Sequence, residues 1–77
     1  MLGSQTSYEK EICDHIVEIR TKLRTRQLLP RERQEEMARL QRYYDELRHE
    51  ANEHSNAPQR LKDNLDYIER CEKKKGM

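Results

Sequence analysis

Apolar residues recur along the chain at spacings of three and four, the period of an amphipathic helix. In the N-terminal part they fill a sector of roughly 80°, the width of a core-facing stripe. The members of this stripe are Tyr8, Ile12, Ile16, Ile19 and Leu23. Thr6 and Glu9 stand before it at the spacing of a capping box, in which each residue satisfies a backbone N–H of the other. The pattern predicts a first helix over about residues 6–28.

The strongest pattern lies in the middle of the chain. Five apolar positions follow one another there at intervals of 3, 4, 3 and 4, which is a heptad seam over two repeats. They are Met37, Leu40, Tyr44, Leu47 and Ala51. Pro30 disfavours a helical conformation at Leu29 but fits the first turn of a helix. We therefore expect a second helix over about 30–55, with Leu28 and Leu29 closing one end of the core.

A third helix is predicted over about 57–74. Asn56 is a suitable N-cap and Pro58 suits the first turn. The apolar stripe of this segment is narrower, and Tyr67 flanks it. Its members are Leu61, Leu65, Ile68 and Cys71. The segment 4–75 contains no glycine, so Pro30 and Pro58 are its main helix breakers.

These elements predict an all-α fold, a three-helix up-down-up bundle formed by one domain over residues 6–75. Short connections make neighbouring helices antiparallel. Residues 1–5 are expected to form a disordered leader and residues 76–77 a tail. The alternative is a helical hairpin that dimerises into a four-helix bundle. In the first arrangement Cys13 and Cys71 lie toward opposite ends, too far apart for a disulfide.

The composition indicates a thin core that a partner chain can complete. Of 77 residues, 40% are charged and 32% are apolar, and the chain has no Trp or Phe. A formal charge of +1 excludes binding to nucleic acid through net charge alone. No segment approaches the ~20 apolar residues of a membrane span, and no signal peptide is recognisable, so we expect an intracellular, soluble protein.

The segment 49–54 reads HEANEH, one residue longer than the zinc motif H-E-x-x-H. On a helix, residues five apart differ by about 140° around the axis, so His49 and His54 cannot both face one metal ion. Glu46 and His49 form one E-x-x-H pair, but both lie on the polar side of the predicted helix. We expect no metal site here.

Nothing else in the sequence indicates catalysis. No internal glycine is present to form a phosphate-binding loop, and no nucleophile is spaced with a base. His15, Cys13 and Cys71 are most simply packing residues beside the apolar stripes. The sequence predicts a non-catalytic protein without a cofactor or a small-molecule substrate.

One local charge imbalance is present, at residues 20–33 between the first two helices. It contains six cations against Glu32 alone: Arg20, Lys22, Arg24, Arg26, Arg31 and Arg33. Such a corner suits phosphates of nucleic acid or lipid head groups, or an acidic protein. It also suits a solvated corner that complements the helix dipole.

Four further residues are predicted to contact a protein partner, provided that they stay exposed in the folded chain. These are Val17, Tyr43, Leu47 and Tyr67. Val17 points about 100° or more away from the first apolar stripe, which indicates a second neighbour for that helix. The leading hypothesis is a helical protein–protein interaction module, either self-associating or docking a partner helix. The alternative is a nucleic-acid-associated regulatory protein that uses the basic corner.

Overall fold

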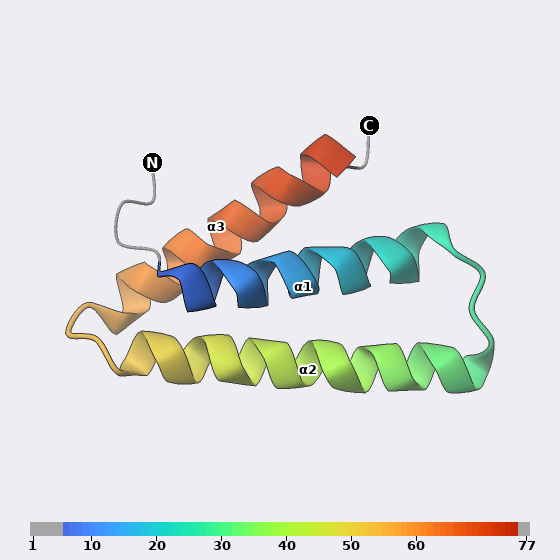
Figure 1. Ribbon diagram of the computed structural model, residues 1–77, viewed down its shortest axis with the longest axis horizontal. Helices are drawn as coiled ribbons and strands as arrows, with labels where there is room; N and C mark the ends of the chain where they lie inside the picture. The colour runs from blue at the N-terminus through green and yellow to red at the C-terminus, as the bar shows by residue number, and fades with distance from the viewer. Residues whose placement is uncertain (1–5, 76–77) are drawn as a thin grey trace.

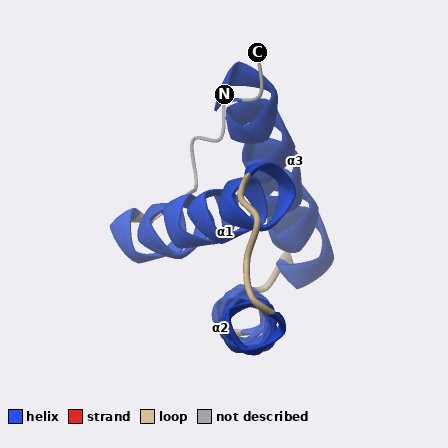
Figure 2. Cartoon of the chain, turned by 90° about the vertical axis from the view of Figure 1, so that its right-hand side faces the viewer, coloured by secondary structure: helices blue, strands red, loops and turns tan. Residues whose placement is uncertain are grey.

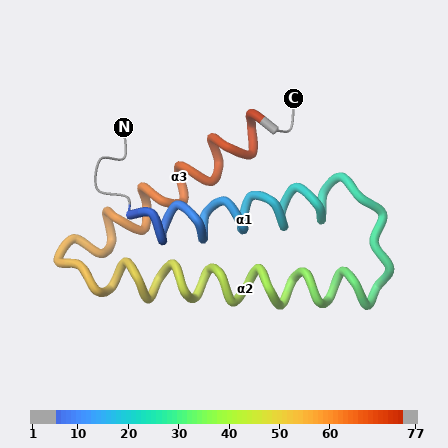
Figure 3. The backbone as a smooth tube through the Cα atoms, viewed as in Figure 1, coloured from blue at the N-terminus to red at the C-terminus, as the bar shows by residue number. Residues whose placement is uncertain are grey.

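The computed structural model describes residues 6–75. The three helices are α1 (Ser7–Thr25), α2 (Pro30–Asn52) and α3 (Ala57–Lys75). Helix α2 runs antiparallel to α1, and α3 returns in the direction of α1 (Figures 1 and 3). The predicted all-α, up-down-up, three-helix bundle is therefore confirmed. The expected leader at residues 1–5 and tail at 76–77 lie outside the described residues.

Helix α1 begins where the capping box predicts. The Thr6 hydroxyl accepts from the Glu9 backbone N–H at 3.1 Å, and the Thr6 N–H donates to Glu9 Oε1 at 3.3 Å. The helix ends at Thr25, three residues earlier than predicted, because Arg26 is already extended with ψ near 145°. Residues 26–29 form the connection that leads to α2.

Both connections agree with the proline and asparagine signals. Pro30 is the first residue of α2, and the Leu29 N–H donates to Glu32 Oε1 at 3.1 Å. Helix α2 stops at Asn52 rather than near residue 55, so His54 lies beyond its end. The Asn56 carbonyl then accepts from the Arg60 N–H at 3.0 Å and opens α3.

Helix α1 is the central element of the core, because it packs more extensively against each of the other two helices than they pack against each other. Four of the six residues in the buried apolar cluster belong to it. The cluster contains Ile12, Cys13, Ile16, Val17, Leu47 and Ile68. Cys13 and Asp14, which lie one helical turn before Val17 on the same side of α1, both contact α3. We therefore infer that α3 is the second neighbour of Val17. No disulfide joins Cys13 and Cys71.

A charged cluster is buried where the start of α1 meets α3. The Glu9 side chain is fully buried and forms an ion pair with Arg60, which is 6% exposed. Asn64 Nδ2 donates to the other Glu9 oxygen at 2.6 Å, and the Cys13 thiol contacts Asn64 at 3.8 Å. Burial alone would raise the pKa of Glu9, but hydrogen bonds from Asn64, Arg60 and the helix cap outweigh it and lower the pKa.

Several apolar residues that were expected to face the core are exposed instead. Met37 is 54% exposed, Leu29 67% and Leu65 38%. The reason is the course of α3, which crosses α1 and moves away from α2 toward its C-terminal end (Figures 1 and 2). Leu65 and Met37 therefore lack a facing helix, and Leu29 lies in the turn rather than closing the core.

Replacing Arg60 with Ala should lower the free energy of unfolding by about 3 kcal/mol or more, because the Glu9 charge would stay buried without its partner. Urea unfolding followed by circular dichroism measures the change. Arg70→Ala, an exposed change on the same helix, should stay within about 0.5 kcal/mol of the parent. Equal effects of the two changes would contradict the role of the Glu9–Arg60 pair.

The lowered pKa of Glu9 gives a pH dependence of defined sign. A carboxyl whose pKa is lower in the folded than in the unfolded chain stabilises the fold fully above the unfolded value, near 4.5. This stabilisation is lost as the pH falls through the folded pKa. The stability gap between the parent and Glu9→Gln should therefore be large at neutral pH and shrink in strong acid. Urea unfolding at each pH measures this difference in stability. A difference that stays constant from neutral pH to strong acid would refute the lowered pKa of Glu9.

Candidate functional site

Two of the four predicted contact residues are not on the surface. Val17 is 1% exposed and Leu47 is fully buried. Val17 is covered because α3 packs on that side of α1, and Leu47 is part of the core cluster. The condition for their predicted role, exposure in the folded chain, is therefore not met. Tyr43 and Tyr67 are half-buried and remain available.

Tyr67 connects α3 to α1. Its hydroxyl donates to Asp14 Oδ1 at 3.2 Å. Burial raises its pKa, and so do the contact with the Cys71 thiol and the charge of Asp14, because each disfavours the phenolate. The polar end of Tyr67 thus serves contacts between α3 and α1.

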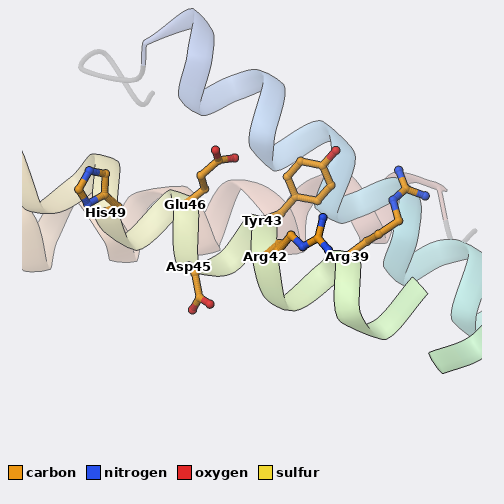
Figure 4. Close-up of a pocket in the computed structure, with 6 residues that line it drawn as sticks. All are labelled: Arg39, Arg42, Tyr43, Asp45, Glu46 and His49. Carbon is orange, nitrogen blue, oxygen red and sulfur yellow. The ribbon is translucent and has the colours of Figure 1, made fainter. Parts of the chain in front are cut away.

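Tyr43 lies in a surface groove of about 480 Å³ on the outer side of α2. The lining residues are Arg39, Arg42, Tyr43, Asp45, Glu46 and His49. Figure 4 shows the Tyr43 ring pointing toward α1, while Asp45 points away from it. Helix α3 lies behind the α1–α2 pair in the same view, so no helix within residues 6–75 covers this side (Figures 1 and 4).

The Tyr43 ring is held in place by a histidine from α1. His15 stacks on it with the ring centroids 5.0 Å apart and the planes 9° from parallel. Stacked aromatic pairs contribute about 0.5–1.5 kcal/mol beyond the area they bury. The stack joins α1 and α2 beside the groove.

The groove continues along the α1–α2 pair toward the turn between these helices. A second, smaller depression shares Arg39 with it, and a third shares Glu18 and Lys22 with the second. Lys22 pairs there with Glu36 at 3.5 Å, and Arg39 pairs with the same carboxylate at 3.1 Å. The side of the α1–α2 pair opposite α3, which we call the open face, is thus hollowed along most of its length.

Ionisable groups of the open face influence each other's titration. A hydrogen bond with Tyr43 raises the pKa of Arg39, and the nearby Glu36 adds to the effect. At the other end, a hydrogen bond with Glu46 raises the pKa of Tyr8, and Glu50 and Glu11 add negative charge around it. Arg42 is exposed and makes no ion pair within the described part of the chain. This arrangement suits contacts of both signs around a central aromatic ring.

The predicted basic corner is divided by the fold. Arg20 Nε and Arg24 both reach Glu72 of α3, at 2.9 and 3.0 Å, and Arg20 also donates to the Tyr44 hydroxyl at 2.9 Å. Lys22 is paired with Glu36. Three members stay exposed without an ion pair to any described residue: Arg26, Arg31 and Arg33. Half of the predicted patch therefore holds helices together.

The HEANEH segment does not assemble a metal site. His49 lies on α2 and pairs with Glu53 at 3.5 Å, whereas His54 follows the end of the helix. Among residues 6–75, no three His, Cys, Asp or Glu side chains are placed to hold a metal ion. Within the same range, no helix has the length and hydrophobicity needed to cross a membrane.

Sequence reasoning missed the polar side chains that face the core from α3. Arg60, Asn64 and Glu72 are all buried, although an apolar stripe one position away was expected to face inward. One signal was present: these residues and Ile68 follow at intervals of four, on one side of a helix. The stripe through Leu61 and Leu65 looked more hydrophobic and was preferred.

Comparisons with protein-family models, with curated proteins and with solved structures find no match.

Glu72 should stabilise the bundle through its two arginines. Glu72→Ala should lower the free energy of unfolding by about 1–2 kcal/mol, a modest value because both arginines are partly exposed. The matched change Glu69→Ala, at an exposed position three residues earlier, should cost less than about 0.5 kcal/mol. The gap between the two variants should shrink in 1 M salt. Indistinguishable thermal melting curves would rule out this role.

Proposed function

We propose that this protein is a non-catalytic helical interaction module that binds another protein through the open face of its α1–α2 pair. The observation that carries the proposal is the groove beside Tyr43. An aromatic ring, held by the stack with His15 and rimmed by charged groups, lies there half-exposed, and no described helix covers the groove. Tyrosine and arginine are the residue types that protein interfaces favour.

The packing of the bundle supports the same function. Only three residues of the 23-residue helix α2 are buried: Glu36, Leu47 and Ala51. Two antiparallel helices present a groove in which a further helix packs, as in four-helix bundles. Helix α3 occupies one side of the α1–α2 pair, so a partner helix on the open face would complete the packing around α2.

The alternative function, binding of nucleic acid at the basic corner, has less support from the geometry. Arg20 and Arg24 are engaged with Glu72 and Lys22 with Glu36, which leaves three exposed arginines, one at the end of α1 and two in the first turn of α2. Tyr43, the aromatic ring suited to stacking, lies in the separate groove on α2. We therefore favour the protein partner.

Site-specific photo-crosslinking tests the proposal. A benzophenone amino acid placed at position 49, within the groove, should yield a covalent adduct with a protein in cells that produce the chain. The same group at position 62, on the exposed side of α3, should yield none. Mass spectrometry then identifies whether the adduct joins two copies of the chain or a different protein.

The matched controls for this experiment lie on α2 itself. Tyr43→Asp should abolish the adduct, whereas Met37→Asp, at an exposed position of the same helix outside the groove, should retain it. Circular dichroism verifies that both variants keep their helices. Adducts of equal yield from positions 49 and 62, or no protein adduct at all, would contradict the proposed function.

A further inference from the structure

The charges of the groove are separated along α2. Arg39 and Arg42 come before Tyr43, and Asp45 and Glu46 come after it. All four side chains line the same groove, with the aromatic ring between the two signs (Figure 4). Arg42, Asp45 and Glu46 are exposed, so their charges are available to a partner.

Helix α1 extends this separation, because it runs antiparallel to α2. At the acidic end, Tyr8 stands among the carboxylates of Glu46, Glu50 and Glu11. At the other end, Lys22 and Arg26 line the continuation of the groove. Glu18 and Glu36 lie among these cations, and Glu36 is shared by Lys22 and Arg39, so the basic end is less strongly charged than the acidic end.

A surface with one sign at each end is complementary to itself when it is reversed. A two-fold axis perpendicular to the groove performs this reversal, because it sets the basic end of one copy against the acidic end of the other. Parallel pairing of the same faces would instead oppose like charges, which costs affinity. The charge order therefore favours one partner and one orientation.

We propose that the open face binds the open face of a second copy of this chain, with the two α2 helices antiparallel about a two-fold axis near Tyr43. This inference rests on the proposed function, since it names the partner. The register sets Arg42 opposite Glu46 of the second copy, and the symmetry repeats this pair. The two Tyr43 rings lie beside the axis.

The resulting assembly joins the two α1–α2 pairs into a four-helix arrangement, while each α3 stays on its own α1. It differs from the hairpin dimer considered from sequence, in which the third helix crosses to the partner. The paired residues are exposed and mostly charged, so we expect a weak dimer, with a dissociation constant on the order of micromolar or higher. Its affinity decreases with salt, because exposed pairs are screened.

Charge exchange at the axis tests the pairing. Sedimentation equilibrium of the full chain should show a reversible monomer–dimer equilibrium. Arg42→Glu places like charges at both symmetry-related contacts, and so does Glu46→Arg. Each variant alone should weaken dimerisation at least about tenfold. An equimolar mixture of the two variants pairs opposite charges at both contacts and should dimerise within about threefold of the parent.

Arg33→Glu is the control, because Arg33 is exposed on α2 outside the groove and should leave the dissociation constant unchanged. Thermal melting verifies that every variant is folded. The inference is overturned by a strictly monomeric parent up to about 1 mM. It is also overturned by a dimer that neither charge change weakens, or by variants whose mixture fails to restore dimerisation. An adduct from position 49 to a different protein, with a monomeric parent, would reject self-pairing but retain the interaction module.

Discussion

The Glu9 carboxylate is the group on which the arrangement of the bundle depends. Its side chain completes the cap of α1 by accepting a hydrogen bond from the Thr6 N–H. The same side chain forms an ion pair with Arg60 and accepts a hydrogen bond from Asn64, both on α3. A buried charge is tolerated only with such partners, since an uncompensated one costs several kcal/mol. The position of α3 is consequently fixed by polar contacts of strict geometry as well as by apolar packing, which is less directional.

A second set of charges fixes the C-terminal part of α3. Glu72 receives Arg20 and Arg24 from α1, and Arg20 also reaches Tyr44 of α2. Both polar sets attach α3 to α1, and α3 crosses α1 and leaves α2 toward its C-terminal end (Figure 2). The open face exists for this reason: among the described residues only α3 packs on the α1–α2 pair, and its charges direct it to the opposite side.

The local signals in the sequence were sufficient for the fold. The capping box at Thr6, the proline at the start of α2 and the helical spacing of apolar residues gave the helices, their order and the fold class. They failed where a side chain's surroundings depend on another helix. Met37 continues a heptad seam but is exposed because α3 diverges, and Val17 is buried because α3 arrives. For the site, the sequence singled out Tyr43, but its stack with His15 and the groove along α2 depend on how α1 and α2 pack together, which periodicity does not specify.

Because Glu9 takes part both in the cap of α1 and in the contact with α3, the opening motions of these two parts of the chain are coupled. Its partners on α3 lie 51 and 55 residues further along the sequence, so the contact is among the least local in the protein. Opening of α3 would leave the Glu9 charge without Arg60 and Asn64. The carboxylate would then rotate into solvent and give up its hydrogen bond with the Thr6 N–H, which would loosen the first turn of α1. The first amides of α1, which would fray alone in an isolated helix, thereby belong to the same cooperative unit as α3 and exchange their hydrogens with it.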